Sequence, residues 1–247
     1  MNGYRFADAA RMEWIKLRSL RSTWWTLLFT VAATVGIGVA AGANTRNAAG
    51  DPTNNILVGV ALAQVVLGVL GVLAITGEYS SGTIRATLAA IPNRPLVLAA
   101  KAAVFGALAL AAGELAAFVA FLAGVAALPA TIPQPALGQP AVLRAVALSG
   151  AYLGLMGLIG LGLGAVLRHG AGAISTLVGG VFVLPLVGLA RTSAGRFLPE
   201  LIAANSLTAV KPVPGYMLSP WAGLGIVCAY AAVLLAAGCA LLVRRDA

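Results

Sequence analysis

The sequence predicts an all-α membrane protein with six transmembrane helices, an N-terminal amphipathic interface helix and a short cytoplasmic helix between two spans. Hydrophobic residues make up 60% of the 247 residues and charged residues only 9%, whereas soluble domains carry about 25% charged residues. The apolar residues fall in runs of the length that crosses a bilayer, and basic residues gather at the ends of these runs. We therefore expect one transmembrane domain over residues 1–247 and no separate soluble domain.

The N-terminal segment, residues 1–22, is basic and amphipathic, with apolar residues at near-helical spacing. This pattern indicates a helix that rests in the membrane interface. The first span is expected at about 23–43, and its apolar core exceeds the 7–15 residues of a signal peptide. The pattern therefore favours an uncleaved anchor over a cleaved leader. The apolar positions of the interface helix are Phe6, Ala10, Trp14 and Leu17.

Five further apolar runs complete the predicted bundle. Residues 77–97 form the connection between the second and third spans, and residues 191–220 form the longest loop on the opposite side. The predicted spans are about 56–76, 98–127, 142–167, 171–190 and 221–243.

The distribution of basic residues predicts the orientation, because cytoplasmic segments carry more Lys and Arg. With six spans, eleven of the sixteen basic residues lie on the side that holds both termini and the 77–97 loop. We therefore expect both termini in the cytoplasm. The excess of arginine over lysine and the abundance of alanine and glycine indicate a bacterial protein of the cytoplasmic membrane. The other side carries Arg46, Arg144, Arg191, Arg196 and Lys211.

Several classes of function are not expected from this composition. The formal charge of +9 is explained by topology and lipid contacts, so no nucleic-acid partner is expected. A phosphate-binding loop needs a lysine that follows glycine, and no lysine here does. The single histidine, His169, excludes a paired-histidine zinc site, and neither a Gly-x-Ser-x-Gly elbow nor a metal-binding carboxylate cluster occurs. We predict that the chain is not an enzyme and holds no cofactor.

Two polar residues interrupt the predicted spans. Glu114 lies in the middle of the third span and Gln64 in the second. A charge at the centre of a span costs roughly 2.5–3.5 kcal/mol to insert, so Glu114 is a candidate for a substrate path. The neutral, polar Gln64 raises the same question to a lesser degree. For Glu114, a hydrogen-bonded structural carboxyl remains the alternative.

The 77–97 loop carries the most informative pattern in the chain. Glu78 and the following hydroxyl residues suit a helix start. Ile84, Leu88 and Ile91 then form an apolar stripe, and a proline-rich segment stops the helix. A short helix with an exposed apolar edge suits docking into a groove on a partner. From spacing alone, a helix lying on the membrane surface is an equal alternative.

Three segments of the chain resemble the membrane subunit of type-2 ATP-binding-cassette (ABC) exporters. A basic amphipathic helix with a Glu-x-x-Lys-Leu stretch precedes the first span, an acidic-Tyr stretch with Gly-Thr follows the second span, and a basic dipeptide with an acid ends the chain. The resemblance covers nearly the whole chain. The matching segments are Glu13-Trp14-Ile15-Lys16-Leu17-Arg18, Glu78-Tyr79-Ser80-Ser81-Gly82-Thr83-Ile84 and Arg244-Arg245-Asp246.

The resemblance implies a permease (membrane) subunit whose 77–97 loop is a coupling helix on a separate ATPase subunit. ATP and Mg²⁺ would be bound by two copies of that ATPase, and a second permease subunit would complete a homodimer or heterodimer. The cargo would be amphiphilic, because few polar residues face inward. The implied coupling residues are Glu78, Tyr79, Gly82, Thr83, Ile84, Arg85 and Leu88, and the implied interface-helix residues are Trp14, Lys16, Leu17 and Arg18.

Transport of this kind needs helices that pack closely and slide. Small residues suit such contacts, although the glycines also fit a general bias in composition. The candidate glycines are Gly38, Gly42, Gly160 and Gly164. Two other functions stay open: a stand-alone channel or secondary carrier, and a membrane immunity or scaffold protein.

Overall fold

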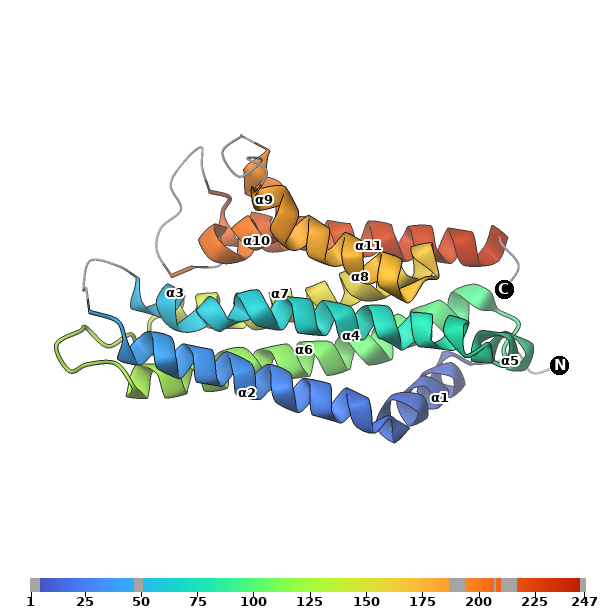
Figure 1. Cartoon of the computed structure of the whole chain (residues 1–247), viewed down its shortest axis with the longest axis horizontal. Coiled ribbons are helices and arrows are strands. Elements are labelled where there is room, and N and C mark those ends of the chain that lie inside the picture. The colour runs from blue at the N-terminus through green and yellow to red at the C-terminus, as the bar shows by residue number, and fades with distance from the viewer. Residues whose placement is uncertain (1–4, 47–50, 187–193, 207, 210–216, 245–247) are drawn as a thin grey trace.

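The computed structural model describes residues 5–46, 51–186, 194–206, 208–209 and 217–244. Every regular element within these residues is a helix. The long helices run side by side, with α3 toward one end of the bundle and α5 at the other (Figure 1). Their bounds are α1 Phe6–Ser19, α2 Arg21–Ala43, α3 Pro52–Ile56, η1 Leu57–Gly59, α4 Val60–Ser80, α5 Thr83–Ala90, α6 Arg94–Ala126, α7 Pro140–Leu167, α8 Gly170–Val178, η2 Gly179–Val183, α9 Leu184–Leu186, η4 Gly195–Phe197, α10 Pro199–Leu201, η5 Ile202–Ser206 and α11 Pro220–Arg244.

Five helices among the described residues are long and apolar enough to cross a membrane. They include the predicted first, second, third, fourth and sixth spans, which confirms an all-helical architecture of the membrane type. The predicted span at 171–190 corresponds to a shorter apolar helix, Gly170–Val183. A π-helical turn, η2, interrupts it at Gly179, and residues 187–190 lie outside the described part of the chain.

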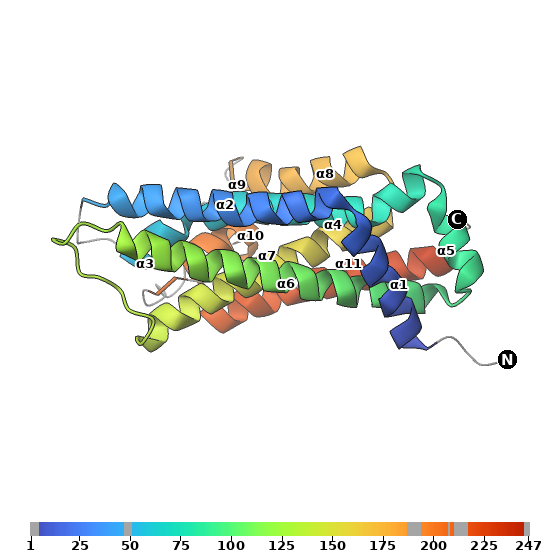
Figure 2. The ribbon, with the colours of Figure 1, turned by 90° about the horizontal axis from the view of Figure 1, so that it is seen from below.

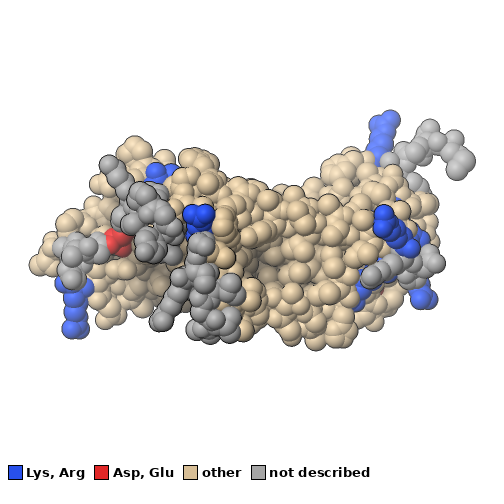
Figure 3. Space-filling view, turned by 90° about the horizontal axis from the view of Figure 1, so that it is seen from above, with Lys and Arg blue, Asp and Glu red and all other residues tan. Residues whose placement is uncertain are grey.

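The helix α7 forms the centre of the bundle. It packs most extensively on α4, α6 and α11, and α2 covers the outer side of α6. Of the five long helices, α7 is the most buried, whereas α2 and α11 are the least. Figure 3 shows Lys and Arg at the two ends of the molecule and an uncharged surface between them on the face seen. Such an apolar waist is what a lipid bilayer would surround.

Glycines allow the central helices to approach closely. A Cβ atom added to Gly71 of α4 would lie 2.0 Å from the carbonyl oxygen of Gly157 in α7. A Cβ atom added to Gly160 would lie 1.9 Å from that of Gly68. On the other side of the bundle, a Cβ atom on Gly42 would lie 2.3 Å from the carbonyl oxygen of Gly124. Of the candidate glycines, Gly42 and Gly160 therefore lie at close helix contacts, where larger residues would separate the backbones.

The helix α1 crosses the end of the bundle at which α5 also lies (Figures 1 and 2). The expected N-terminal helix is therefore present. Ala9, Glu13 and Leu17 are buried where α1 packs on α6, whereas Phe6 and Trp14 are exposed. A charged partner on α6 meets Glu13.

Candidate functional site: a four-charge cluster

Two acids and two lysines from three helices meet at the end of the bundle crossed by α1. We call Glu13, Lys16, Glu78 and Lys101 the four-charge cluster. The Nζ atom of Lys101 lies 2.5 Å from Oε2 of Glu13 and 2.6 Å from Oε1 of Glu78. The Nζ atom of Lys16 lies 2.9 Å from Oε1 of Glu13 and 3.0 Å from Oε1 of Glu78. Each lysine therefore bridges both carboxylates, and α1 is joined to α4 and α6.

The cluster is largely shielded from solvent. Glu13 is 1% exposed and Lys101 is also buried, whereas Lys16 is partly exposed. Burial alone would lower the pKa of Lys16, but hydrogen bonds and charges from Glu13 and Glu78 outweigh it and raise that pKa above its ordinary value. A buried ion pair gains stability only when both charges are matched, and removal of one partner is costly. The balanced pairing accounts for the presence of these charges in an apolar protein.

The short helix α5 is linked to this cluster through Thr87. The Nζ atom of Lys16 donates to Oγ1 of Thr87 over 3.0 Å, and the same hydroxyl donates to Oε2 of Glu78 over 3.4 Å. The chain enters α5 through Gly82, whose φ of +72° is in the left-handed region that favours glycine. The turn and the hydroxyl contacts fix α5 against the end of α4, so α5 and α1 share the same charged groups.

The apolar stripe of α5 faces its own bundle, which corrects the expected exposed apolar edge. Ile84 and Ile91 are each 4% exposed, and Leu88 packs against the core. The spacing predicted the stripe but not the surface it would meet, and α1, α4 and α6 supply that surface. The outer face of α5 carries Arg85, Ala86, Ala89 and Ala90 instead.

Two arginines hold the end of α11 at the same end of the bundle. Arg94 donates to the carbonyl oxygen of Leu242 over 2.8 Å, and Arg168 donates to that of Leu241 over 3.0 Å. The Arg168 guanidinium also lies over the ring of Tyr79, 5.3 Å from its centroid. Tyr79, expected in the coupling segment, thus contacts the connection between α7 and α8. Of the predicted C-terminal motif, Arg244 ends α11, and Arg245 and Asp246 lie outside the described residues.

The predicted site residues are only partly brought together. Lys16 and Glu78 belong to the cluster and Leu17 is buried beside it, whereas Trp14, Arg18, Thr83 and Arg85 are exposed. Lys101 and Thr87 were not predicted as site residues from the sequence. A lysine inside an apolar helix needs a partner, and this requirement was the signal available for Lys101.

The two polar residues of the predicted substrate path lie in different surroundings. Gln64 is fully buried; it accepts a hydrogen bond from the hydroxyl of Tyr152 and donates one to Oε2 of Glu200. Glu114 is partly exposed and lies against Gly150 of α7. No hydrogen bond or ion pair joins its carboxylate to another described residue.

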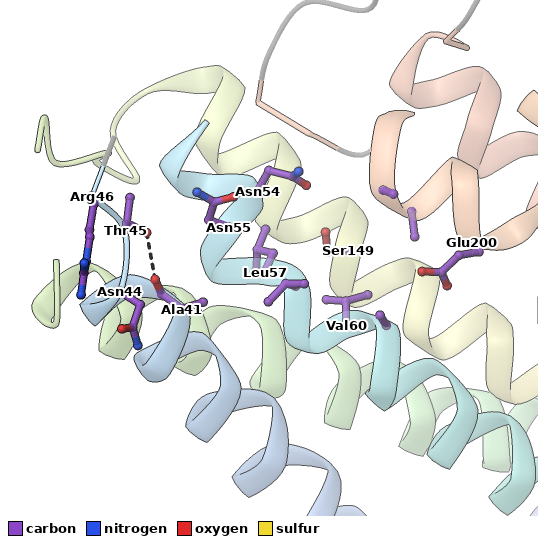
Figure 4. A pocket seen from close by; sticks show the side chains of 14 residues that line it. Ala41, Asn44, Thr45, Arg46, Asn54, Asn55, Leu57, Val60, Ser149 and Glu200 are labelled. Carbon is purple, nitrogen blue, oxygen red and sulfur yellow. Dashed lines mark hydrogen bonds between the residues drawn. The ribbon is translucent and has the colours of Figure 1, made fainter. Parts of the chain in front are cut away.

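A pocket of about 560 Å³ lies at the end of the bundle opposite α1 and α5 (Figure 4). It is formed by the end of α2, the α3–η1–α4 segment and the α10–η5 segment. Its lining combines Arg46, Glu200 and asparagine side chains with apolar residues such as Leu57 and Val60. The molecule thus carries a buried charged site at one end and an open mixed pocket at the other.

Comparisons with known proteins identify no family for this chain. No protein-family model matches the chain, and no curated protein matches it at a significant level.

Proposed function

We propose that this chain is the permease subunit of an ABC exporter, which moves an amphiphilic substrate outward with ATP hydrolysed by a separate ATPase subunit. The single observation that supports this function best is the four-charge cluster. It connects the N-terminal helix, the end of α4 and the base of α6 in one buried network, and Thr87 adds α5. A displacement of α5 would thus reach two further helices through direct contacts.

In this proposal the ATPase subunit docks on the outer face of α5, not on its apolar stripe. Ala86, Ala89 and Ala90 are exposed and small, and Arg85 adds a positive charge beside them. Small side chains let a partner approach the helix backbone closely, and an exposed arginine suits a carboxylate on the partner. The inward stripe of Ile84, Leu88 and Ile91 serves to fix α5 to the bundle.

The proposed assembly is the one that the family resemblance implies. Two copies of the ATPase bind two permease subunits, which form a homodimer or a heterodimer in the bacterial cytoplasmic membrane. The shorter helix Gly170–Val183 belongs to a sixth span, so that both termini lie in the cytoplasm. Glu114, which is partly exposed and has no hydrogen-bond or ion-pair partner among the described residues, would lie on the substrate path between the two permease subunits.

The test replaces a small residue on the proposed docking face. The substitution Ala86→Trp places a bulky side chain on this face and blocks close approach, so it should abolish co-purification with the proposed ATPase subunit and should stop ATP-driven export. The control is Ala7→Trp, the same change at an exposed position of α1, which should keep both properties. Full ATPase binding and export by Ala86→Trp would refute the docking face.

A second measurement separates the proposed function from its alternatives. Purified chain reconstituted in liposomes without ATPase should not move solute. Solute flux without ATP would indicate a channel or secondary carrier. Protection of cells that persists after loss of every ATPase partner would indicate an immunity or scaffold protein.

A further inference from the structure

The outward face of α1 carries arginine and large apolar side chains together. Arg11 and Arg18 are seven residues apart in this helix, which places them about 20° apart around the helix axis and about 10 Å apart along it. Trp14 and Ile15 lie between them in the chain, and all four side chains are exposed. This face of α1 therefore presents cations and an apolar surface side by side.

The corner between α1 and α2 extends this face (Figure 2). Leu20 leaves the helical conformation, with φ −85° and ψ 105°. The Nε1 atom of Trp24 then donates to the carbonyl oxygen of Arg18 over 3.2 Å, which fixes the first turn of α2 against the last turn of α1. Arg21, Trp24 and Trp25 are exposed beside this corner. We call the following residues the corner surface: Arg11, Trp14, Ile15, Arg18, Arg21, Trp24 and Trp25.

The positive charge of the corner surface is not balanced by the chain itself. Among the described residues, no ion pair joins Arg11, Arg18 or Arg21 to an acid. Of the two acids of α1, Glu13 is buried in the four-charge cluster, and Asp8 accepts a hydrogen bond from the backbone N–H of Arg5 over 3.3 Å. Three guanidinium groups are thus available to an anion outside the chain, and guanidinium suits phosphate in particular.

The tryptophans select the kind of anion. They stand at the start of α2, one of the five helices long and apolar enough to cross a membrane, and exposed tryptophan is typical of the boundary between lipid head groups and acyl chains. An acidic protein would match the arginines, but it would have to displace lipid from the indole rings. An anionic phospholipid matches both, because its phosphate meets the arginines and its acyl chains meet the apolar side chains.

We propose that the corner surface binds anionic phospholipid head groups in the leaflet that it faces, with phosphate groups at Arg11, Arg18 and Arg21. Glu13 and Lys16 project from the other side of α1 into the four-charge cluster, so lipid and cluster hold this helix from two sides. The binding is a property of this chain alone. A failure of the exporter assignment would leave it intact, and its own failure would leave the docking face of α5 untouched.

The test uses the tryptophans as reporters. The chain has four tryptophans; three belong to the corner surface, and Trp221 lies at the start of α11. In the Trp221→Phe background, fluorescence therefore reports the corner surface alone. The full chain is reconstituted in phosphatidylcholine nanodiscs that contain a small fraction of acyl-brominated phosphatidylglycerol or the same fraction of equally brominated phosphatidylcholine. Phosphatidylglycerol should quench more strongly.

A pair of matched variants tests the arginines. Arg18→Gln should reduce the preference for phosphatidylglycerol over phosphatidylcholine about fivefold, the factor expected for one arginine at an anionic surface. Arg46→Gln makes the same change at an exposed arginine at the opposite end of the bundle and should leave the preference unchanged.

Four results would overturn the proposal. Equal quenching by the two lipids would exclude a charge-selective lipid site, and an unchanged preference in Arg18→Gln would exclude this arginine as a contact. Displacement of phosphatidylglycerol by inorganic phosphate at constant ionic strength would assign the arginines to a free phosphate ion. Displacement by polyglutamate under the same conditions would assign the surface to an acidic protein partner.

Discussion

Lys16 and Lys101 donate to the same atom, Oε1 of Glu78, over 3.0 and 2.6 Å. The two lysines are far apart in the chain, and both also contact Glu13. The four groups thus form a closed arrangement in which each charge has two opposite neighbours. In an otherwise apolar protein this arrangement concentrates the electrostatic contacts at one end of the bundle.

The first prediction concerns the buried lysine. Lys101→Met removes its charge at similar length and leaves Glu13 buried beside one lysine only. Breaking a buried pair in this way costs about 3–5 kcal/mol, so the melting temperature of the detergent-solubilised protein should fall strongly. The double variant Glu13→Gln with Lys101→Met should lose less than the sum of the single variants, because the two residues are coupled. Arg85→Met, which removes an exposed cation at the same end, is the control. Additive losses in the double variant would show that the pair is not coupled.

The second prediction separates the effect of Thr87 on protein stability from its effect on the coupling of ATP hydrolysis to export. Thr87→Val keeps the shape of the side chain but removes the hydroxyl that contacts Lys16 and Glu78. The stability loss should be modest, about 1 kcal/mol. In the complex with the ATPase, ATP hydrolysis should continue while export per ATP falls. Measured export and hydrolysis that fall in the same proportion would assign Thr87 a structural role only.

The third prediction uses two glycines of α4. Gly71→Ala places a methyl group against the backbone of Gly157 and should cost about 1–3 kcal/mol, the usual range for overpacking. Gly77→Ala, in the same helix, meets no atom within 4 Å and should be neutral or stabilising by about 0.5–1 kcal/mol, because alanine favours the helix. Thermal unfolding of both variants in one detergent checks the pair. Similar melting temperatures would mean that the helices separate easily at this contact.

The sequence predicted the long helices well, because a run of apolar residues bounded by charges has few other stable structures. It predicted the apolar stripe of α5 but not the surface that the stripe contacts. Ile84 and Ile91 have the same spacing whether they contact a partner, a membrane or their own bundle. In α1, the apolar Trp14 is exposed and the charged Glu13 is buried. Only the fold brings Lys101 to that position. The pocket was not predicted, because Arg46 and Glu200 are distant in sequence and neither belongs to a recognisable motif.

The four-charge cluster is electrically neutral, and this determines how it responds to the membrane potential. Its two carboxylates and two ammonium groups sum to zero. A single charge that crosses the full membrane potential does work of roughly 2.3 kcal/mol per 100 mV, whereas a neutral group of charges that moves together does none. A shift of the joint between α1, α4 and α6 along the membrane normal would therefore require the same electrical work at every membrane voltage.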